Sequence, residues 1–394
     1  MTATEFPAEP ITPYQVVGLS PSVRPIRQRK DIATNLDHIE RLVRVAMWNA
    51  AMDIPVRLVT LPEGALQGFT DEVLDIDHVE YARECAIDIP GPETDRLSKI
   101  CRSYSIFMMA TAKARHEEFP ERFFNIGFII DPTGEVILRH HKVAVLQPYE
   151  SSVTPHNVWK EWIELYGSTL DAFYPVADTA IGRLGFMMAN EAAYPENARG
   201  LALNGCEVAY RGPYPSSFYA EIQNRARALD NNMYVIGNQN GAALPMDKTR
   251  EDTVGIDNSW RHSMIVDYKG LVISEMTHGG GATFLTGTVD IEALRYFRTH
   301  AQWGNWAKDL PMEQFQLIYG SSIYPPDLFL ARSPMLQDEY RRVVTRKQID
   351  LLIERGIWVR PYSDRSQGTR SENLEGSEAV IDGVSGQAVS DSER

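Results

Sequence analysis

The feature that most constrains the fold of this chain is a regular alternation of short apolar runs with amphipathic segments between residues 14 and 289. The segment 35–50 places Leu36, Ile39, Val43 and Met47 near a 3.6-residue period behind Thr34, which predicts a capped amphipathic helix. The apolar runs are rich in β-branched and aromatic residues and predict strands at 14–19, 56–61, 106–110, 123–130, 136–143, 184–188, 207–210, 233–237, 263–267 and 282–289. A chain in which strands and helices interleave in this way forms a layered α/β or α+β fold.

Turn and breaker residues punctuate the pattern. Asp131-Pro132-Thr133-Gly134 separates two apolar runs and predicts a hairpin. Further helices are predicted at 94–104, after Pro90-Gly91-Pro92, and from 194 to 203.

Three of the predicted strands end in ionisable or polar residues. These ends are Leu61-Pro62-Glu63-Gly64, Arg139-His140-His141-Lys142, and Met188-Ala189-Asn190-Glu191 with the following Tyr194-Pro195-Glu196. Ligands of layered α/β proteins collect outside the carboxyl ends of strands. A buried Glu beside a Lys would suit acyl transfer, with the Glu as base and the Lys stabilising an oxyanion, but none of the three segments carries a cysteine nucleophile.

Composition excludes several other classes of protein. The 394 residues carry a formal net charge of −14 and no dense basic block, which argues against a nucleic-acid partner. The N-terminus lacks a secretory signal and no apolar run nears 18 residues, so we expect a cytoplasmic protein without a membrane partner. Cys85, Cys101 and Cys206 are isolated, which predicts neither disulfides nor a thiolate zinc site.

Taken in order, the three strand ends resemble the motifs of the nitrilase superfamily of carbon-nitrogen hydrolases. Leu61-Pro62-Glu63 resembles the glutamate motif, residues 125–142 resemble the lysine motif with its Asp-Pro-x-Gly turn, and residues 185–199 resemble the cysteine motif. Residues 204–208 and 263–270 extend the likeness, which covers about residues 14–290. The resemblance implies a four-layer αββα sandwich with a C-terminal helical arm and a Glu-Lys-Cys reaction centre.

The chain departs from the family pattern at the nucleophile, because Ala189 stands where the resemblance places the catalytic cysteine. A methyl group cannot attack a carbonyl carbon. Either the chain is an engineered inactive variant or it belongs to a branch that lost the thiol naturally, and in that case it is a cysteine-free enzyme in which Glu63 activates water, or a pseudoenzyme that serves as a binding or assembly module. Cys206 is no substitute, since it falls on a predicted interior strand.

The resemblance implies a role for each matching position. Glu63 is expected to be the general base, and Lys142 with the backbone N–H of Asn190 to hold the oxyanion. Glu150, eight residues after Lys142, corresponds to a second glutamate of the amidase branch that orients the site. Expectations for the remaining motif residues are a substrate pocket lined by Glu191 and Tyr194, and structural support from Glu196 and Arg199, which can pair with each other or across an interface.

Neither a metal nor a cofactor is expected. His140 and His141 are adjacent, so on a strand they point to opposite faces, and the sequence offers no second cluster of ligands. The expected partner is a small amide: Asn190-Glu191 differs from the Trp-Glu of true nitrilases, and Ala192 and Ala193 replace the arginines with which carbamoylases grip a carboxylate.

The domain organisation follows from the same pattern. We expect an N-terminal arm at 1–13, the carbon-nitrogen hydrolase domain at 14–290, a helical extension at 291–361 and a disordered polar tail at 362–394. Members of the family pair through the faces of the sandwich and use C-terminal arms, so the resemblance implies a homo-oligomer, a dimer or higher.

Overall fold

The computed structural model describes residues 9–212, 219–240, 242–243, 263–276, 282–320 and 322–361. By its internal contacts the chain divides into two units, residues 1–344 and residues 345–394. The predicted polar tail at 362–394 and most of the predicted N-terminal arm lie outside the described residues. The predicted extension at 291–361 contains the last four α-helices, from Ile291–His300 to Arg346–Glu354, and includes residues of both units.

Two mixed sheets form the centre of the first unit. The first sheet has the order β14 (Thr283–Val289), β1 (Tyr14–Ser20), β3 (Val56–Thr60), β4 (Phe107–His116), β5 (Phe119–Ile130), β6 (Val136–His141). The second has the order β13 (Val272–Met276), β12 (Ser263–Val266), β10 (Tyr234–Gly237), β9 (Val208–Tyr210), β8 (Gly182–Phe186), β7 (Val176–Thr179). A short pair joins β2 (Ser22–Val23) to β11 (Ala242–Ala243).

Strand direction brings the ends of several strands to one edge of each sheet. In the first sheet β1, β3 and β4 are parallel, and in the second β8, β9 and β10 are parallel. The segments that follow β3, β8, β9 and β10 therefore leave from the carboxyl edges of their sheets, where ligands of layered folds collect.

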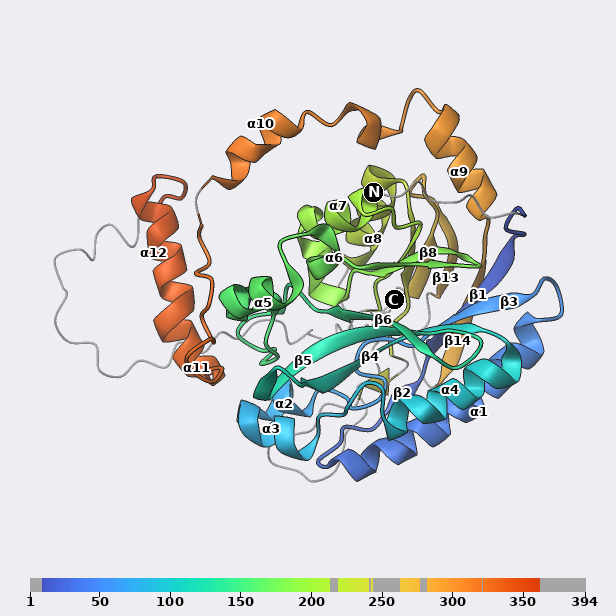
Figure 1. The fold of residues 1–394 in the computed structure, drawn as a ribbon, viewed down its shortest axis with the longest axis horizontal. Helices are drawn as coiled ribbons and strands as arrows, with labels where there is room; N and C mark the ends of the chain where they lie inside the picture. Colours follow the sequence, from blue (N-terminus) through green and yellow to red (C-terminus); the bar gives the residue numbers. More distant parts are fainter. Residues whose placement is uncertain are drawn as a thin grey trace, which may run out of the picture. The chain divides into compact units, whose positions relative to one another are not determined.

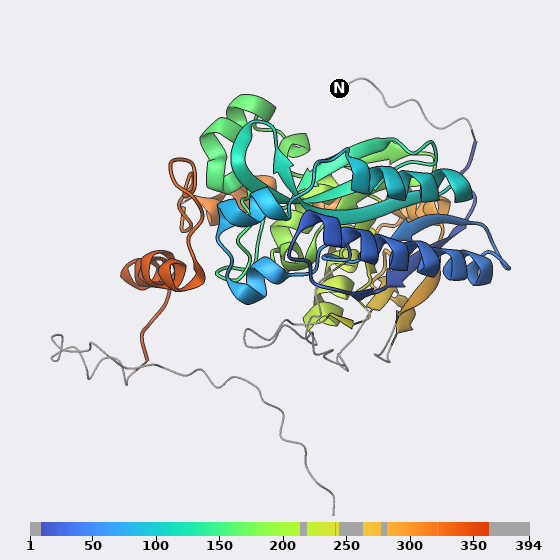
Figure 2. The same ribbon diagram turned by 90° about the horizontal axis from the view of Figure 1, so that it is seen from below.

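Helices cover the outer faces of both sheets. The helices of the first unit are α1 (Ile32–Ala50), α2 (Thr70–Leu74), α3 (His78–Glu84), α4 (Pro92–Tyr104), α5 (Trp159–Tyr166), α6 (Leu170–Phe173), α7 (Pro195–Leu203), α8 (Tyr219–Asn231), α9 (Ile291–His300), α10 (Met312–Gln316) and α11 (Gln337–Tyr340). The second unit contains α12 (Arg346–Glu354). Figure 1 and Figure 2 both show α1 and α4 running side by side along the first sheet, and α8 packs on β10 and β12 of the second.

Alternation along the strands explains why the fold has four layers. Val16 and Met109 point into the core between the two sheets, whereas their neighbours Val17 and Met108 point into the core under α1 and α4. On the second sheet, residue 236 faces the core between the sheets and residue 235 faces α7 and α8. Strands buried on both faces read as continuous apolar runs, and this confirms the predicted αββα sandwich.

The predicted strands and helices are present, but β7, β13 and the helices α2, α3, α5 and α6 were not predicted. The predicted cap at Thr34 was wrong, because α1 begins at Ile32 with Asp31 as its N-cap and Thr34 lies inside the helix. The predicted hairpin is present, with the Asp131 carboxylate accepting hydrogen bonds from the N–H groups of Thr133 and Glu135. The strand predicted to end at residue 110 instead continues to His116, because its partner β5 is longer still and pairs with it from Met108 to His116. A lysine, Lys113, therefore lies inside a buried strand.

None of the helices in the described ranges combines the length and the apolar character that crossing a lipid bilayer requires.

Candidate active site

Glu63 lies in the turn after β3, and segments from the other sheet fix its backbone. Its N–H donates to the carbonyl of Gly212 at 2.9 Å, and its carbonyl accepts from Asn240 Nδ2 at 2.6 Å. Gly64 follows at φ +75°, and a Cβ there would lie 2.4 Å from the ring of Phe69, so only glycine fits this turn. The backbone of Glu63, which follows a strand of the first sheet, is thus held by the segments that follow β9 and β10 of the second sheet.

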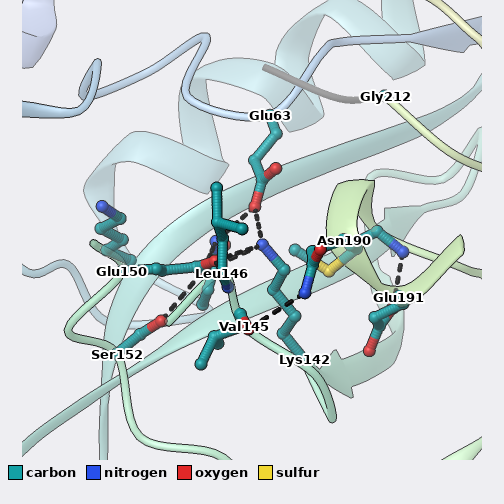
Figure 3. Close-up of polar contacts among 12 residues, drawn as sticks. Glu63, Lys142, Val145, Leu146, Glu150, Ser152, Asn190, Glu191 and Gly212 are labelled. Atoms are coloured by element: carbon teal, nitrogen blue, oxygen red, sulfur yellow. Dashed lines mark hydrogen bonds and ion pairs between the residues drawn. The ribbon is translucent and has the colours of Figure 1, made fainter. Parts of the chain in front are cut away.

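Lys142 follows β6 and places its ammonium between two buried carboxylates. Its Nζ lies 2.7 Å from Glu63 Oε1 and 2.7 Å from Glu150 Oε2, and all three side chains are at most 4% exposed. Asn125 on β5 donates from Nδ2 to Glu63 at 2.5 Å and to Glu150 at 3.0 Å. Figure 3 shows Glu63, Lys142 and Glu150 converging from separate segments of the chain.

Glu150 is anchored more heavily than Glu63. It accepts hydrogen bonds from the N–H of Leu146 at 3.2 Å and from Ser152 Oγ at 3.1 Å, in addition to those from Lys142 and Asn125. Because each of these groups donates a hydrogen bond to Glu150, together they favour the ionised form of its carboxylate.

The surroundings therefore shift the pKa values of Glu63 and Glu150 in opposite directions. Burial raises the pKa of Glu63, with the charge of Glu150 adding to it and Lys142 opposing it. Burial would also raise the pKa of Glu150, but the Lys142 and Lys113 ammonium groups and its hydrogen bonds lower it instead. Burial would lower the pKa of Lys142, but the two glutamates outweigh it and raise that pKa. The cluster thus holds one firmly ionised carboxylate, one cation and one carboxyl group suited to exchanging a proton.

Ala189 opens a 3₁₀ turn, Ala189–Ala193, at the end of β8. Its φ is +38°, a left-handed backbone conformation that is strained for any residue other than glycine. A strained turn that displays one residue at a strand end is the geometry expected of a nucleophile position. Here the displayed side chain is a methyl group.

Glu191 joins this turn to the strand end that carries Lys142. Its carboxylate accepts from the N–H of Met188 at 2.5 Å and from the N–H of Val143 at 2.6 Å, and it lies 3.0 Å from His140 Nε2. Asn190 adds a second link, donating from Nδ2 to the carbonyl of Val145 at 3.0 Å (Figure 3). We call the residues Ala189, Asn190 and Glu191 the elbow.

The structure places Glu191 differently from the sequence-based expectation. That expectation put Glu191 on the substrate pocket, but its side chain is 1% exposed and its oxygens are engaged by donors of the protein. Its physical role here is to clamp the elbow. Tyr194, the other residue expected to line the pocket, is half exposed.

The two support residues do not pair with each other in the described part of the chain. Glu196 accepts a hydrogen bond from the hydroxyl of Tyr319 at 2.7 Å, and Arg199 Nη1 is buried without a partner there. The two histidines point to opposite faces, as predicted: His140 contacts Glu191, whereas His141 packs on Trp162. Cys206 is buried, and burial raises the pKa of its thiol to about 12.

Sequence reasoning missed a second buried lysine beside the cluster. Lys113 Nζ lies 2.5 Å from Asp71 Oδ1 and 2.8 Å from Glu72 Oε1. The signal was a lysine three residues after the apolar run at 106–110, where the predicted strand was ended too early. Asp71 and Glu72 lie on α2 and gave no comparable signal.

Among the described residues, no group of three or more His, Cys, Asp or Glu side chains is arranged to hold a metal ion.

Comparison with known proteins identifies the family. The model of the carbon-nitrogen hydrolase family matches residues 16–299. The chain belongs to this family. It is thereby a member of the nitrilase superfamily, as its three motifs predicted.

Relatives of this family member include amidases. It is 27% identical over 226 residues to omega-amidase NIT2 of Xenopus tropicalis, covering 56% of the chain and 74% of the relative. It is 26% identical over 232 residues to a formamidase of Bacillus thuringiensis (strain Al Hakam), covering 58% of the chain and 62% of that enzyme.

Solved structures share the fold. A cysteine-to-alanine mutant of an amidase from Nesterenkonia sp., in complex with butyramide, superposes with a TM-score of 0.55 at 17% identity, covering 77% of the chain and 96% of the amidase. Nit3 of Saccharomyces cerevisiae, a member of branch 10 of the nitrilase superfamily, gives 0.55 at 19% identity, covering 74% of the chain and 95% of Nit3.

Proposed function

We propose that this carbon-nitrogen hydrolase binds a small amide at the Glu63–Lys142–Glu150 cluster, and that it lacks only the thiol for covalent hydrolysis of that amide. The observation that carries the proposal is the position of Lys142 Nζ, 2.7 Å from each of two buried carboxylates at the end of its strand. The names of the amidase relatives support the amide as the class of substrate.

Each group has a role that its environment suits. Glu63 is the general base, because burial raises its pKa and so makes its carboxylate a stronger proton acceptor. Lys142 and the N–H of Asn190 are the donors for the carbonyl oxygen as it gains negative charge. Glu150 keeps the ammonium of Lys142 in place through its two hydrogen bonds to Nζ.

A cysteine at position 189 would complete a balanced reaction. Glu63 takes the thiol proton as sulfur attacks the amide carbon, and the C–N bond breaks as Glu63 gives that proton to the leaving nitrogen. Water then attacks the thioester, losing a proton to Glu63, and the proton returns to sulfur as the acid leaves. With Ala189 the site can bind the amide, but it cannot form the thioester.

The test is the Ala189→Cys variant with butyramide, acetamide and formamide as substrates and ammonia release as the measurement. We expect turnover in this variant and none through an acyl-enzyme in the protein with Ala189. Ala193→Cys is the matched control, because it places a thiol on the exposed end of the same turn. Absence of ammonia release from a folded Ala189→Cys protein across a wider panel of amides would contradict the proposal.

A second candidate function uses water in place of the thiol. The raised pKa of Glu63, caused first by burial, supports it, since such a carboxylate can deprotonate a water held beside the amide. Incorporation of one ¹⁸O from labelled water by the protein with Ala189, without an acyl-enzyme in the mass spectrum, is the expected result. Thermal stabilisation by butyramide without turnover would instead indicate a binding module.

We propose a cytoplasmic homo-oligomer, a dimer or higher, in which the helical extension at 291–361 contacts another copy and Glu196 and Arg199 support the interface. The expected result is a mass of at least twice 44.5 kDa by light scattering, falling when the chain is truncated after residue 300.

A further inference from the structure

A second buried lysine lies behind the catalytic cluster, on β4. The side chain of Lys113 is 4% exposed, and its Nζ contacts Asp71 Oδ1 at 2.5 Å and Glu72 Oε1 at 2.8 Å. The rings of Phe69 and Tyr81 lie 5.5 and 5.6 Å from the same ammonium. A cation so deeply buried keeps its charge only because these groups compensate it.

The backbone of Lys113 holds the loop that carries Glu63. Its N–H donates to Gln67 Oε1 at 2.7 Å, and its carbonyl accepts from Gln67 Nε2 at 2.9 Å. Gln67 lies four residues after Glu63, and the N–H of Gly68 closes the loop by donating to the carbonyl of Gly64 at 2.7 Å. Position 113 thus fixes the far side of the turn on which Glu63 lies.

The partners of Lys113 also hold the turn that carries Glu150. Asp71 Oδ2, on the carboxylate that binds Lys113, accepts from Ser151 Oγ at 3.4 Å. The carbonyl of Ser151 lies 2.9 Å from His78 Nδ1, and His78 Nε2 accepts from the N–H of Phe123. With Nε2 an acceptor, Nδ1 carries the proton and donates to Ser151. The residue next to Glu150 is therefore held by α2 and α3.

The charge of Lys113 also acts on Glu63 and Glu150, the two glutamates that contact Lys142. The Lys113 ammonium lowers the pKa of both Glu150 and Glu63, second to Lys142 among the charges acting on Glu150. Two cations, Lys142 and Lys113, thus face four carboxyl groups in one buried region, two at each lysine.

We propose that Lys113 is a positioning residue of the active site, which holds the Glu63 loop by its backbone and keeps Glu150 ionised against Lys142 by its charge. Its effect on turnover rests on the proposed function, whereas its effect on Glu150 does not. Removing the cation should raise the pKa of Glu150, and removing its partner Asp71 should lower it, since a negative charge in the same region is lost.

Other groups that face Lys113 must be considered in reading such a titration. They are Asp71 and Glu72 on α2, His78 and Tyr81 on α3, and the glutamates Glu63 and Glu150, with Cys85 after α3 acting on Asp71. Burial, the largest cause, lowers the pKa of His78 to about 4, while burial raises those of Tyr81 and Cys85, so these three stay neutral between pH 5 and 8.

The experiment follows Glu150 directly in the protein with Ala189, by ¹³C NMR of glutamate carboxyl groups, with Glu150→Gln used for assignment. We expect Lys113→Met to raise the Glu150 pKa by about one unit and Asp71→Asn to lower it by a similar amount. Lys99→Met, on the exposed face of α4, is the matched control and should leave it unchanged. Asp71→Asn preserves shape, so it decides the matter if Lys113→Met fails to fold.

The same variants in the Ala189→Cys background link the titration to turnover. The acid limb of kcat/KM should move to higher pH with Lys113→Met and to lower pH with Asp71→Asn, while Lys113→Arg should retain the original profile. The proposal would be overturned if Lys113→Met lowered the rate but shifted neither the acid limb of kcat/KM nor the pKa measured from the Glu150 resonance. Lys113 would then have only a structural role. Shifted resonances with no turnover in any background would refute the proposed function but support the role of Lys113 toward Glu150.

Discussion

The Glu63–Lys142–Glu150 cluster and the elbow are joined at the ends of β6 and β8, and they are built from different interactions. The cluster consists of charged side chains that contact one another, whereas the elbow is held by one carboxylate, Glu191, which accepts from the backbone N–H groups of Met188 and Val143. The cluster retains every charged group that its proposed chemistry needs. The elbow retains its strained shape at Ala189 but has a methyl group where a nucleophile is expected.

Within one site, the charged side chains of the cluster would supply the chemistry, whereas the hydrogen bonds of Glu191 set the backbone shape of the elbow. Glu191 clamps backbone atoms, so the shape of the elbow does not depend on which side chain residue 189 carries. The charges of the cluster depend on one another, because each buried ion needs its partner. A change in the cluster should therefore disturb the fold strongly, and a change at position 189 should disturb it weakly.

The largest expected effect is that of Lys142→Met. It leaves Glu63 and Glu150 buried together without their cation, and breaking such a pair destabilises proteins by about 3–5 kcal/mol. Urea unfolding at pH 7 measures the loss, with the exposed Lys160→Met as the control. Adding Glu63→Gln should recover part of the loss, and a loss below about 1 kcal/mol in the single variant would show that the charges are not interdependent.

Glu191→Ala should have the next largest effect. The N–H groups of Met188 and Val143 lose their acceptor, at about 1–3 kcal/mol for each buried donor left unsatisfied, so we expect a loss of about 2–4 kcal/mol. Glu164→Ala, exposed on α5, should change the free energy of unfolding by no more than about 0.5 kcal/mol. Equal losses in the two variants would remove the basis for calling Glu191 a clamp.

The pH dependence of the free energy of unfolding should distinguish the charged region around Lys113 from the elbow. Burial raises the pKa of Glu72 to about 8, helped by the charges of Asp71 and Glu150 and opposed by Lys113. The folded protein then binds more protons than the unfolded chain between about pH 4.5 and 8, so this group makes stability fall as pH rises through that window. Glu72→Gln should flatten the fall by about 1–2 kcal/mol in unfolding experiments at pH 5 and pH 8, and an unchanged slope would contradict the raised pKa.

The smallest expected effect is at the elbow itself. Glycine tolerates φ +38° without strain, so Ala189→Gly should stabilise the fold by up to about 1 kcal/mol despite the greater entropy of glycine in the unfolded chain. Ala193→Gly, at the other end of the same turn without a positive φ, should instead destabilise it slightly. Loss of stability at both positions would show that the turn at residue 189 is not strained.

Local pattern was enough to predict much of this molecule. The hairpin around residues 131–134, the helix through Leu36 and Met47 and the strand ends carrying Glu63 and Lys142 follow from turn chemistry and hydrophobic period, which neighbouring residues set. The motifs predicted the family for the same reason, since they are short and local. Where prediction failed, as at the end of β4, the length of the strand depends on its distant partner β5.

The sequence by itself determined the layered fold and the family, and it has an alanine at position 189, where the resemblance expects the nucleophile, because each of these is set by the identity and spacing of nearby residues. Only the tertiary structure decided that Glu191 accepts hydrogen bonds from the backbone N–H groups of Met188 and Val143, and that Lys113 is buried against Asp71 and Glu72. Most of these contacts join residues that are 40 or more positions apart, such as Lys113 and Asp71 or Glu191 and Val143. Contacts of that kind arise from the packing of whole sheets and helices, which no local pattern records.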